Sequence, residues 1–188
     1  MASIISAGTT SGTAINISGD TTGNLAFTTQ AGTYTQTVPN ATGTVMVSGN
    51  MPAFRALGSG ISVAGSTFTT FTAFSSPTFD TASAFNTSTG KFQPTVAGYY
   101  QINVKVDYGS NGVAAASSID AGISKNGTTY NYSGCANTGG GSFPAVMCCD
   151  IVYLNGSTDY VQAQAYQNSS STATGVTCSF SGVMVRSA

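Results

Sequence analysis

The stretch Tyr100-Gln101-Ile102-Asn103-Val104-Lys105-Val106-Asp107 alternates apolar and polar side chains without a break. Because successive side chains of a β-strand point to opposite faces, this alternation predicts a strand whose apolar residues, beginning with Tyr100, turn inward. Further along, Lys125-Asn126-Gly127-Thr128 holds an Asn-Gly pair, the strongest short signal for a hairpin turn. Alternation over residues 158–167 and an apolar run over residues 176–185 predict further strands.

The composition also favours strands. Of the 188 residues, 41% are hydrophobic and only 6% are charged, and the chain has no His and no Trp. Strong helix formers are scarce, whereas Thr, Val, Tyr and Phe, which suit a pleated sheet, are abundant. A chain of this length fits one domain of ordinary size plus a modest extra segment. We therefore predict an all-β protein built around a sandwich or jelly roll.

One predicted strand is apolar on both faces. From Phe143 to Leu154 only Asp150 interrupts the apolar side chains. In a two-layer antiparallel sandwich one face of a strand normally meets water, so the second apolar face predicts a surface covered by another subunit. The alternative is a central strand that a long loop of the same chain covers.

The spacing of aromatic residues resembles a known family. Six residues stand at the intervals of the complement C1q globular-head signature, in a family related to the tumour necrosis factor jelly rolls: Phe74, Asp80, Phe85, Phe92, Gly98 and Tyr100. The closing stretch Cys178-Ser179-Phe180-Ser181-Gly182 also resembles the last strand of that family. The resemblance covers about residues 52–186 and implies a ten-strand jelly roll that assembles as a homotrimer, with its closing strands near the threefold axis.

The resemblance and the two-sided strand together give the expected trimer interface. It comprises Phe143, Met147, Cys149, Ile151, Tyr153, Phe180 and Met184. Each of the six signature residues also has a structural meaning, because large aromatic side chains fill cores and Gly98 fits a close backbone approach.

Residues 1–50 differ in texture from the rest. Short apolar pieces recur at roughly ten-residue intervals between Gly, Asn and Asp turn signals, as in Gly23-Asn24-Leu25-Ala26-Phe27. Such strands are too short to close a core alone, so we predict a β-rich attachment or shaft segment over residues 1–50 and the head domain over residues 51–188. This segment resembles the Thr/Gly-rich repeats of bacteriophage virion appendages. A flexible polar tail is the alternative.

Charge and chemistry exclude several classes of function. A net charge of −1 with five scattered Lys and Arg residues gives no surface for nucleic acid or anionic lipid, and no apolar run is long enough to span a membrane. The start, residues 1–7, lacks the features of a secretory signal. Without His the usual nucleophile–base pairs are missing, so we expect no enzyme. We expect no cofactor, although calcium-binding relatives make Asp107 and Asp120 weak calcium candidates.

The four cysteines match no zinc pattern: Cys135, Cys148, Cys149 and Cys178. Neighbouring residues of a strand point to opposite faces, which separates Cys148 from Cys149. We expect free buried thiols. A Cys135–Cys178 or Cys148–Cys178 bridge is the alternative.

The leading functional hypothesis is a bacteriophage structural appendage, a trimeric fibre or decoration protein assembled in the host cytoplasm and carried on the virion. Residues 1–50 would contact other virion proteins, and the head would present exposed loops to a host-surface glycan or protein. The receptor-contact candidates are Tyr130, Tyr132 and Tyr166, because tyrosine offers a large contact area at small entropic loss. The alternatives are a purely architectural capsid or tail decoration, and a secreted lectin-like recognition protein.

Overall fold

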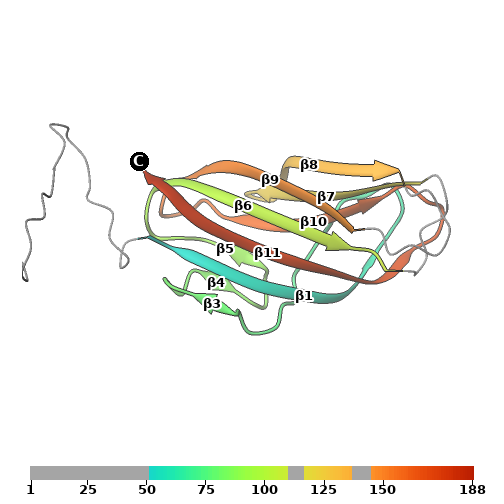
Figure 1. The fold of residues 1–188 in the computed structure, drawn as a ribbon, viewed down its shortest axis with the longest axis horizontal. Helices are drawn as coiled ribbons and strands as arrows, with labels where there is room; N and C mark the ends of the chain where they lie inside the picture. The colour runs from blue at the N-terminus through green and yellow to red at the C-terminus, as the bar shows by residue number, and fades with distance from the viewer. Residues whose placement is uncertain (1–50, 110–116, 137–144) are drawn as a thin grey trace, which may run out of the picture. The chain divides into compact units, whose positions relative to one another are not determined.

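The computed structural model describes residues 51–109, 117–136 and 145–188, and their secondary structure is entirely β (Figure 1). The described residues form eleven strands, where ten were expected, and four of the eleven have only two residues. The strands are β1 (Ala53–Val63), β2 (Thr69–Thr70), β3 (Phe79–Asp80), β4 (Phe85–Asn86), β5 (Lys91–Phe92), β6 (Gly98–Asp107), β7 (Ser118–Lys125), β8 (Thr128–Ala136), β9 (Ala145–Leu154), β10 (Val161–Gln167) and β11 (Ala173–Ser187). The predicted all-β fold is confirmed, and no helix among the described residues is long and apolar enough to cross a membrane.

The strands form two antiparallel sheets that pack face to face. Sheet A has the order β3-β1-β11-β6-β9, and sheet B has the order β4-β5-β10-β7-β8, with β2 paired to β10 (Figure 1). Apart from the β7–β8 hairpin, consecutive long strands lie in different sheets or cross over within one, which is the connectivity of a jelly roll. The predicted sandwich is therefore confirmed.

The core lies between the sheets and is rich in aromatic rings. Phe54 of β1 stacks on Phe92 and Phe85, with ring centroids 4.2 and 5.0 Å apart, and meets Phe180 edge-on at 4.9 Å. The inward side chains of β6 are fully buried as their alternation predicts, and the hydroxyl of Tyr100 donates a hydrogen bond to the carbonyl of Val96. Aromatic residues of this kind bury large areas and favour such stacked and edge-on pairs.

The six signature residues serve this core. Phe85, Phe92 and Tyr100 are buried, and Phe74 packs against the same cluster. Asp80 instead caps a turn, because its carboxylate accepts hydrogen bonds from the amides of Ala84 and Phe85. Gly98 has no room for a side chain: a Cβ there would lie 2.5 Å from the carbonyl oxygen of Arg186.

The two ends of the sandwich differ. At the first, called the terminal end, β1 begins and β11 reaches the end of the chain (Figure 1). At the other, called the loop end, β6 ends beside the start of β9, since Asp107 pairs with Ala145, and β8 ends beside the start of β7, since Ser118 pairs with Ala136. The chain therefore enters β1 at the terminal end, and its connections from β6 to β7 and from β8 to β9 leave from the loop end.

The Asn126-Gly127 turn confirms the predicted hairpin. Both residues have positive φ angles, 52° and 83°, as a tight turn between β7 and β8 requires. After this turn β8 runs to Ala136.

Candidate functional site

The outer face of sheet A is unusually apolar. Ten large hydrophobic side chains are exposed among the described residues, and eight of them belong to this sheet. They alternate along their strands with core residues and so share the outer side. We call these eight residues the apolar face: Leu57, Phe79, Tyr99, Met147, Ile151, Tyr153, Val183 and Val185.

The register aligns the apolar face in rows across the strands. Near the terminal end Tyr153 of β9 lies beside Tyr99 of β6, with ring centroids 5.4 Å apart. In the next row Ile151 pairs with Gln101, which pairs with Val183 of β11. Exposed apolar side chains thus lie in two adjacent rows at this end, with Gln101 between Ile151 and Val183, and clusters of this kind mark interaction sites.

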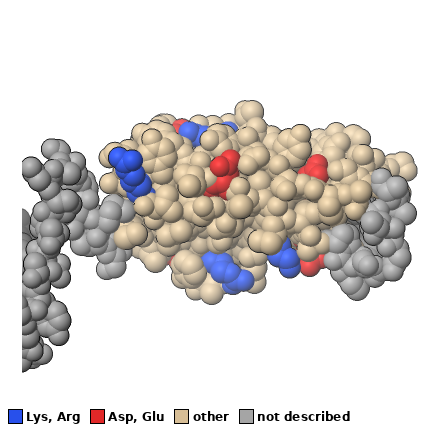
Figure 2. All heavy atoms as spheres, turned by 45° about the horizontal axis from the view of Figure 1, so that its top comes forward, with Lys and Arg blue, Asp and Glu red and all other residues tan. Residues whose placement is uncertain are grey.

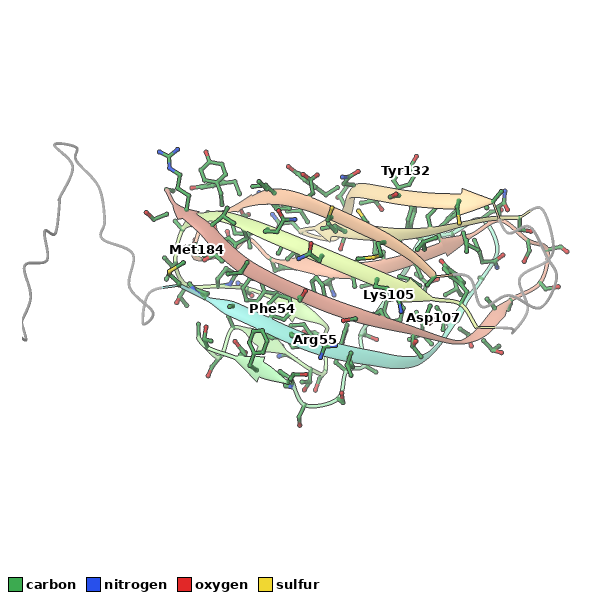
Figure 3. The ribbon with its side chains drawn as sticks, viewed as in Figure 1. Phe54, Arg55, Lys105, Asp107, Tyr132 and Met184 are labelled. Atoms are coloured by element: carbon green, nitrogen blue, oxygen red, sulfur yellow. The ribbon has the colours of Figure 1, made fainter. Side chains whose placement is uncertain are left out.

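Polar and charged residues occupy the middle and loop-end rows of the same face. Arg55 donates a hydrogen bond from Nη1 to Oγ1 of Thr78 at 3.1 Å. Lys105 and Asp107 form an exposed ion pair with 3.7 Å between Nζ and Oδ2 (Figure 3). The face is therefore most apolar near the terminal end, while further along it Met147 and Leu57 share a row with Lys105, and Phe79 pairs with Arg55. Figure 2 shows the charged groups as a few scattered spots on a surface made mostly of uncharged residues.

The structure places four of the predicted interface residues together on this face. Met147, Cys149, Ile151 and Tyr153 point outward from β9. Between them Cys148 and Val152 point into the core, while Asp150 accepts a hydrogen bond from Nδ2 of Asn131 on β8. Within this chain no loop of the described residues covers them, since Met147 is 63% exposed and Ile151 is 51% exposed. The predicted contact Phe143 lies outside the described residues.

Two predicted interface residues were wrongly assigned. The side chains of Phe180 and Met184 are 0% and 1% exposed and belong to the chain's own core. Both lie on β11, whose outward positions between them are taken by Ser181 and Val183. The prediction chose the correct strand and the wrong face, because in a strand the parity of the position decides which side a residue takes.

The cysteines are four free thiols. Cys148 and Cys178 are buried as expected, and burial raises the pKa of Cys148 to about 11 and that of Cys178 to about 12. Cys135 and Cys149 are exposed, contrary to the expectation for all four. Cys148 and Cys178 lie on opposite sides of β6, paired with Val104 and Val106, so this structure contains neither proposed bridge.

The two calcium candidates lie on opposite outer faces. Asp107 projects from β6 in sheet A, next to Lys105, while Asp120 belongs to β7 in sheet B and accepts a hydrogen bond from Oγ of Ser118 at 3.1 Å. They cannot bind one ion together. Among the described residues no group of three or more acidic, Cys or His side chains is arranged to hold a metal.

Two of the three candidate receptor contacts lie together on the outer face of sheet B. The rings of Tyr132 and Tyr166 flank Phe68, with centroid distances of 5.4 and 5.0 Å. Tyr130 makes no ring contact with another described residue. It occupies a bulge in β8, where Asn131 pairs with Ile123 and Thr129 with the next residue of β7, so Tyr130 has no partner across the ladder.

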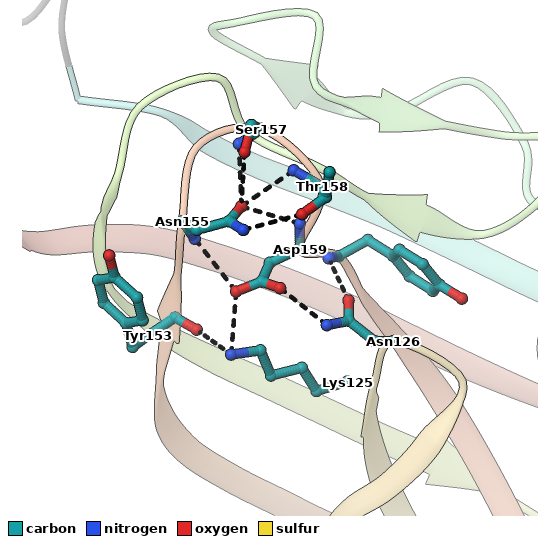
Figure 4. Close-up of polar contacts among 8 residues, drawn as sticks. Lys125, Asn126, Tyr153, Asn155, Ser157, Thr158 and Asp159 are labelled. Carbon is teal, nitrogen blue, oxygen red and sulfur yellow. Dashed lines mark hydrogen bonds and ion pairs between the residues drawn. The ribbon is translucent and has the colours of Figure 1, made fainter.

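A polar network at the terminal end ties the β7–β8 turn to the β9–β10 loop (Figure 4). Nζ of Lys125 lies 3.0 Å from Asp159 and donates a hydrogen bond to the carbonyl of Tyr153. Nδ2 of Asn126 donates to Asp159 at 2.8 Å, and the backbone amide of Asn155 donates to the same carboxylate. The hydrogen bond from Asn126, supported by Lys125, holds the pKa of Asp159 below its ordinary value. The network is a structural clamp, since its groups satisfy one another.

Sequence reasoning missed Phe68. Phe68, Phe71 and Phe74 recur every third residue. Side chains on one face of a strand recur every second residue, so this spacing does not place the three rings on one face of a strand. In the structure they separate: Phe71 is fully buried in the core, Phe74 packs against its edge, and Phe68 lies over the outer face of sheet B. No local pattern distinguishes the three, because the path of the connection between β1 and β3 decides their positions.

No protein-family model and no curated protein sequence matches the chain. Solved structures do match its fold. The globular domain of zebrafish complement 1qA protein aligns with a TM-score of 0.53 and 13% identity, over 73% of this chain and 98% of that one. The chain has a C1q- and TNF-like jelly-roll fold.

Two further structures support this assignment. The PRD1 vertex protein P5 aligns with a TM-score of 0.56 and 14% identity, over 72% of this chain and 97% of that one. The Eiger TNF from S. frugiperda aligns with a TM-score of 0.53 and 10% identity, over 74% of this chain and 95% of that one. At such identities the similarity concerns the fold alone, and the described jelly roll accounts for it.

Proposed function

We propose that the chain is a non-enzymatic subunit of a homotrimer, in which the apolar face of each subunit is covered by its neighbours. The observation that carries this proposal is the placement of eight of the ten exposed large apolar side chains on one sheet. A soluble monomer rarely keeps so large a contiguous apolar surface in water. Three copies around a closed axis cover such a surface without leaving an open edge for further growth.

The trimer serves as a structural appendage of a bacteriophage virion. Two observations support this role: the similarity of the fold to that of a vertex protein, and the repeats of residues 1–50, which resemble those of virion appendages. Because the chain enters β1 at the terminal end, the head is tethered there, and the loop end is available for contacts away from the tether. Residues 1–50 attach the trimer to other virion proteins.

The head binds a receptor on the host surface, and Tyr130, Tyr132 and Tyr166 are its candidate contacts. All three belong to sheet B, on the side of the sandwich away from the apolar face. Several weak contacts suffice for attachment, because three copies on each appendage and many appendages on each particle add avidity.

Cryo-electron microscopy of the parent particle tests the virion assignment. We expect threefold density for the head on the particle surface. Absence of the chain from purified particles, measured by mass spectrometry, contradicts the assignment.

Binding of the purified full chain to host cells tests the receptor role separately. Saturable binding that soluble surface polysaccharide or protease treatment removes supports it. Trimers on the virion that bind cells at no concentration support the purely architectural alternative.

A further inference from the structure

The outer face of sheet B carries an aromatic platform, which we define as Phe68, Tyr132 and Tyr166. Phe68 lies between the two tyrosines, at ring-centroid distances of 5.4 and 5.0 Å. Tyr132 is 58% exposed, so much of its ring area faces solvent (Figure 3). The three rings come from the segment before β2, from β8 and from β10. The sequence pattern of any one of these segments therefore does not predict the cluster.

Two glycines make the platform possible. A Cβ at Gly122 would lie 3.1 Å from Cε1 of Phe68, so the missing side chain lets the Phe68 ring rest on the sheet. A Cβ at Gly134 would lie 1.6 Å from Oδ1 of Asp120, so the carboxylate lies where that side chain would be. Gly122 pairs with Tyr132 and Asp120 pairs with both Gly134 and Tyr166, which places the carboxylate beside the rings.

Asp120 keeps one acceptor available. Its Oδ1 accepts a hydrogen bond from Oγ of Ser118, whereas Oδ2 accepts none from the described residues. Asp120 is 7% exposed, and because no fully buried side-chain oxygen among the described residues lacks a partner, its Oδ2 keeps a small exposed area. A carboxylate oxygen accepts hydrogen bonds only, which suits it to a ligand that brings hydroxyl donors.

We infer that the aromatic platform binds a neutral saccharide, with a pyranose ring stacked on Tyr132 and a sugar hydroxyl donating to Asp120. This inference rests on the proposed receptor-binding role and names the ligand class. Sugar rings present C–H groups on one face and hydroxyl groups at the rim. The platform matches them with the π-faces of its rings and with the Asp120 acceptor at their side.

Charge selects against an anionic ligand. Asp120 repels carboxylate, sulfate and phosphate groups. Lys91, the basic residue on this face among the described residues, already places its ammonium 3.8 Å from the ring centroid of Tyr160. Lys125 is held by Asp159 in the network at the terminal end. A patch with aromatic rings, one carboxylate and no free cation favours uncharged sugars.

The platform stays accessible in the proposed trimer. It lies on sheet B, whereas the apolar face that the trimer covers lies on sheet A. Each trimer therefore presents three platforms, which raises the avidity for a repeating polysaccharide.

Titration of the full-length chain with dextran, mannan and galactan, and with alginate and polysialic acid as anionic comparisons, tests the inference by calorimetry. We expect binding to at least one neutral polysaccharide and to neither anionic one. Tyr132→Ser should weaken the binding about tenfold, the effect of losing one stacked ring, and Asp120→Asn should also weaken it. Thr128→Ala, an exposed position at the start of the same strand, is the matched comparison and should change the affinity by less than about twofold.

Sedimentation of the same samples separates this inference from the proposed function. A trimer that binds none of the neutral polysaccharides, or that binds the anionic ones equally well, overturns the saccharide inference and leaves the trimer standing. Equal losses with Thr128→Ala and Tyr132→Ser also overturn it, because the platform would then not be the site. If Tyr132→Ser fails to fold, Asp120→Asn alone decides: unchanged affinity overturns the inference. A monomer overturns the proposed function instead.

Discussion

Phe180 packs edge-on against Phe54 and is completely buried in the core of its own chain. Replacing the ring by a methyl group removes this packing and leaves a cavity. We expect Phe180→Ala to lower the free energy of unfolding by about 3–5 kcal/mol, as large-to-small core changes do. Urea unfolding followed by circular dichroism at one fixed protein concentration measures the change.

Thr177→Ala is the control for this prediction, because Thr177 is exposed on the same strand. It should shift the free energy by less than about 0.5 kcal/mol. If Phe180→Ala leaves the free energy of unfolding unchanged and only dissociates the oligomer, the ring belongs to the subunit interface, and the core assignment is contradicted.

The four thiols differ in environment, and their reactivity reports on the assembly. Burial and raised pKa values near 11 and 12 leave Cys148 and Cys178 protonated and unreactive at neutral pH. Cys135 is exposed on β8, whereas Cys149 projects from the apolar side of β9, which the proposed trimer covers. We expect a maleimide to modify Cys135 quickly and the other three slowly, measured by mass spectrometry of the native protein. Equal rates at Cys135 and Cys149 would contradict the covered face.

At the scale of elements, Asp159 joins a turn to a loop. Its pKa is held below the ordinary aspartate value, chiefly by the hydrogen bond from Asn126. A carboxylate whose pKa is lower in the folded state stabilises the fold above its unfolded pKa, and this contribution is lost as the pH falls through the folded pKa. We therefore expect Asp159→Asn to cost about 1 kcal/mol at neutral pH, through its lost ion pair and charged hydrogen bonds.

The pH dependence distinguishes this clamp from simple packing. Thermal melts of the two proteins should differ at neutral pH and converge below the pKa of the folded Asp159. A difference that persists unchanged into acid would show that charge contributes nothing. Asp107→Asn is the matched control, because its carboxylate forms an exposed pair with Lys105 and accepts one hydrogen bond from the amide of Gly109, which an Asn side-chain oxygen can also accept, so the change should cost little.

The sequence predicted some elements better than others for physical reasons. The alternation of β6 identified its buried residues, because strand periodicity is local and Tyr100 needs no distant information to turn inward. The assignment of Phe180 to the interface failed for a related reason. The resemblance implied that the closing strand lies near the threefold axis, but it did not say which alternate residues of that strand face outward. The position of Phe68 was not predictable, because it depends on where the connection between β1 and β3 crosses the sheet. Gln164 adds a similar case: it is buried on the outer side of β10 by hydrogen bonds with Thr70 and Thr129.

At the scale of the whole molecule, the two proposals concern opposite outer faces. Sheet A carries the apolar face, which we propose for assembly, and sheet B carries the aromatic platform, which we propose for recognition. We expect Ile151→Asp to dissociate the trimer into folded monomers, because it places three buried charges in the interface without touching the core of any subunit. Circular dichroism should stay unchanged while the sedimentation coefficient falls. Thr128→Asp, exposed on sheet B, should leave the trimer intact.

The native mass of the full-length chain tests the central claim most directly. Native mass spectrometry at micromolar concentration should give three times the 18.9 kDa of a single chain, and one times that mass for Ile151→Asp. A wild-type protein that remains at 18.9 kDa at every accessible concentration would contradict the proposed trimer and the role of its apolar face.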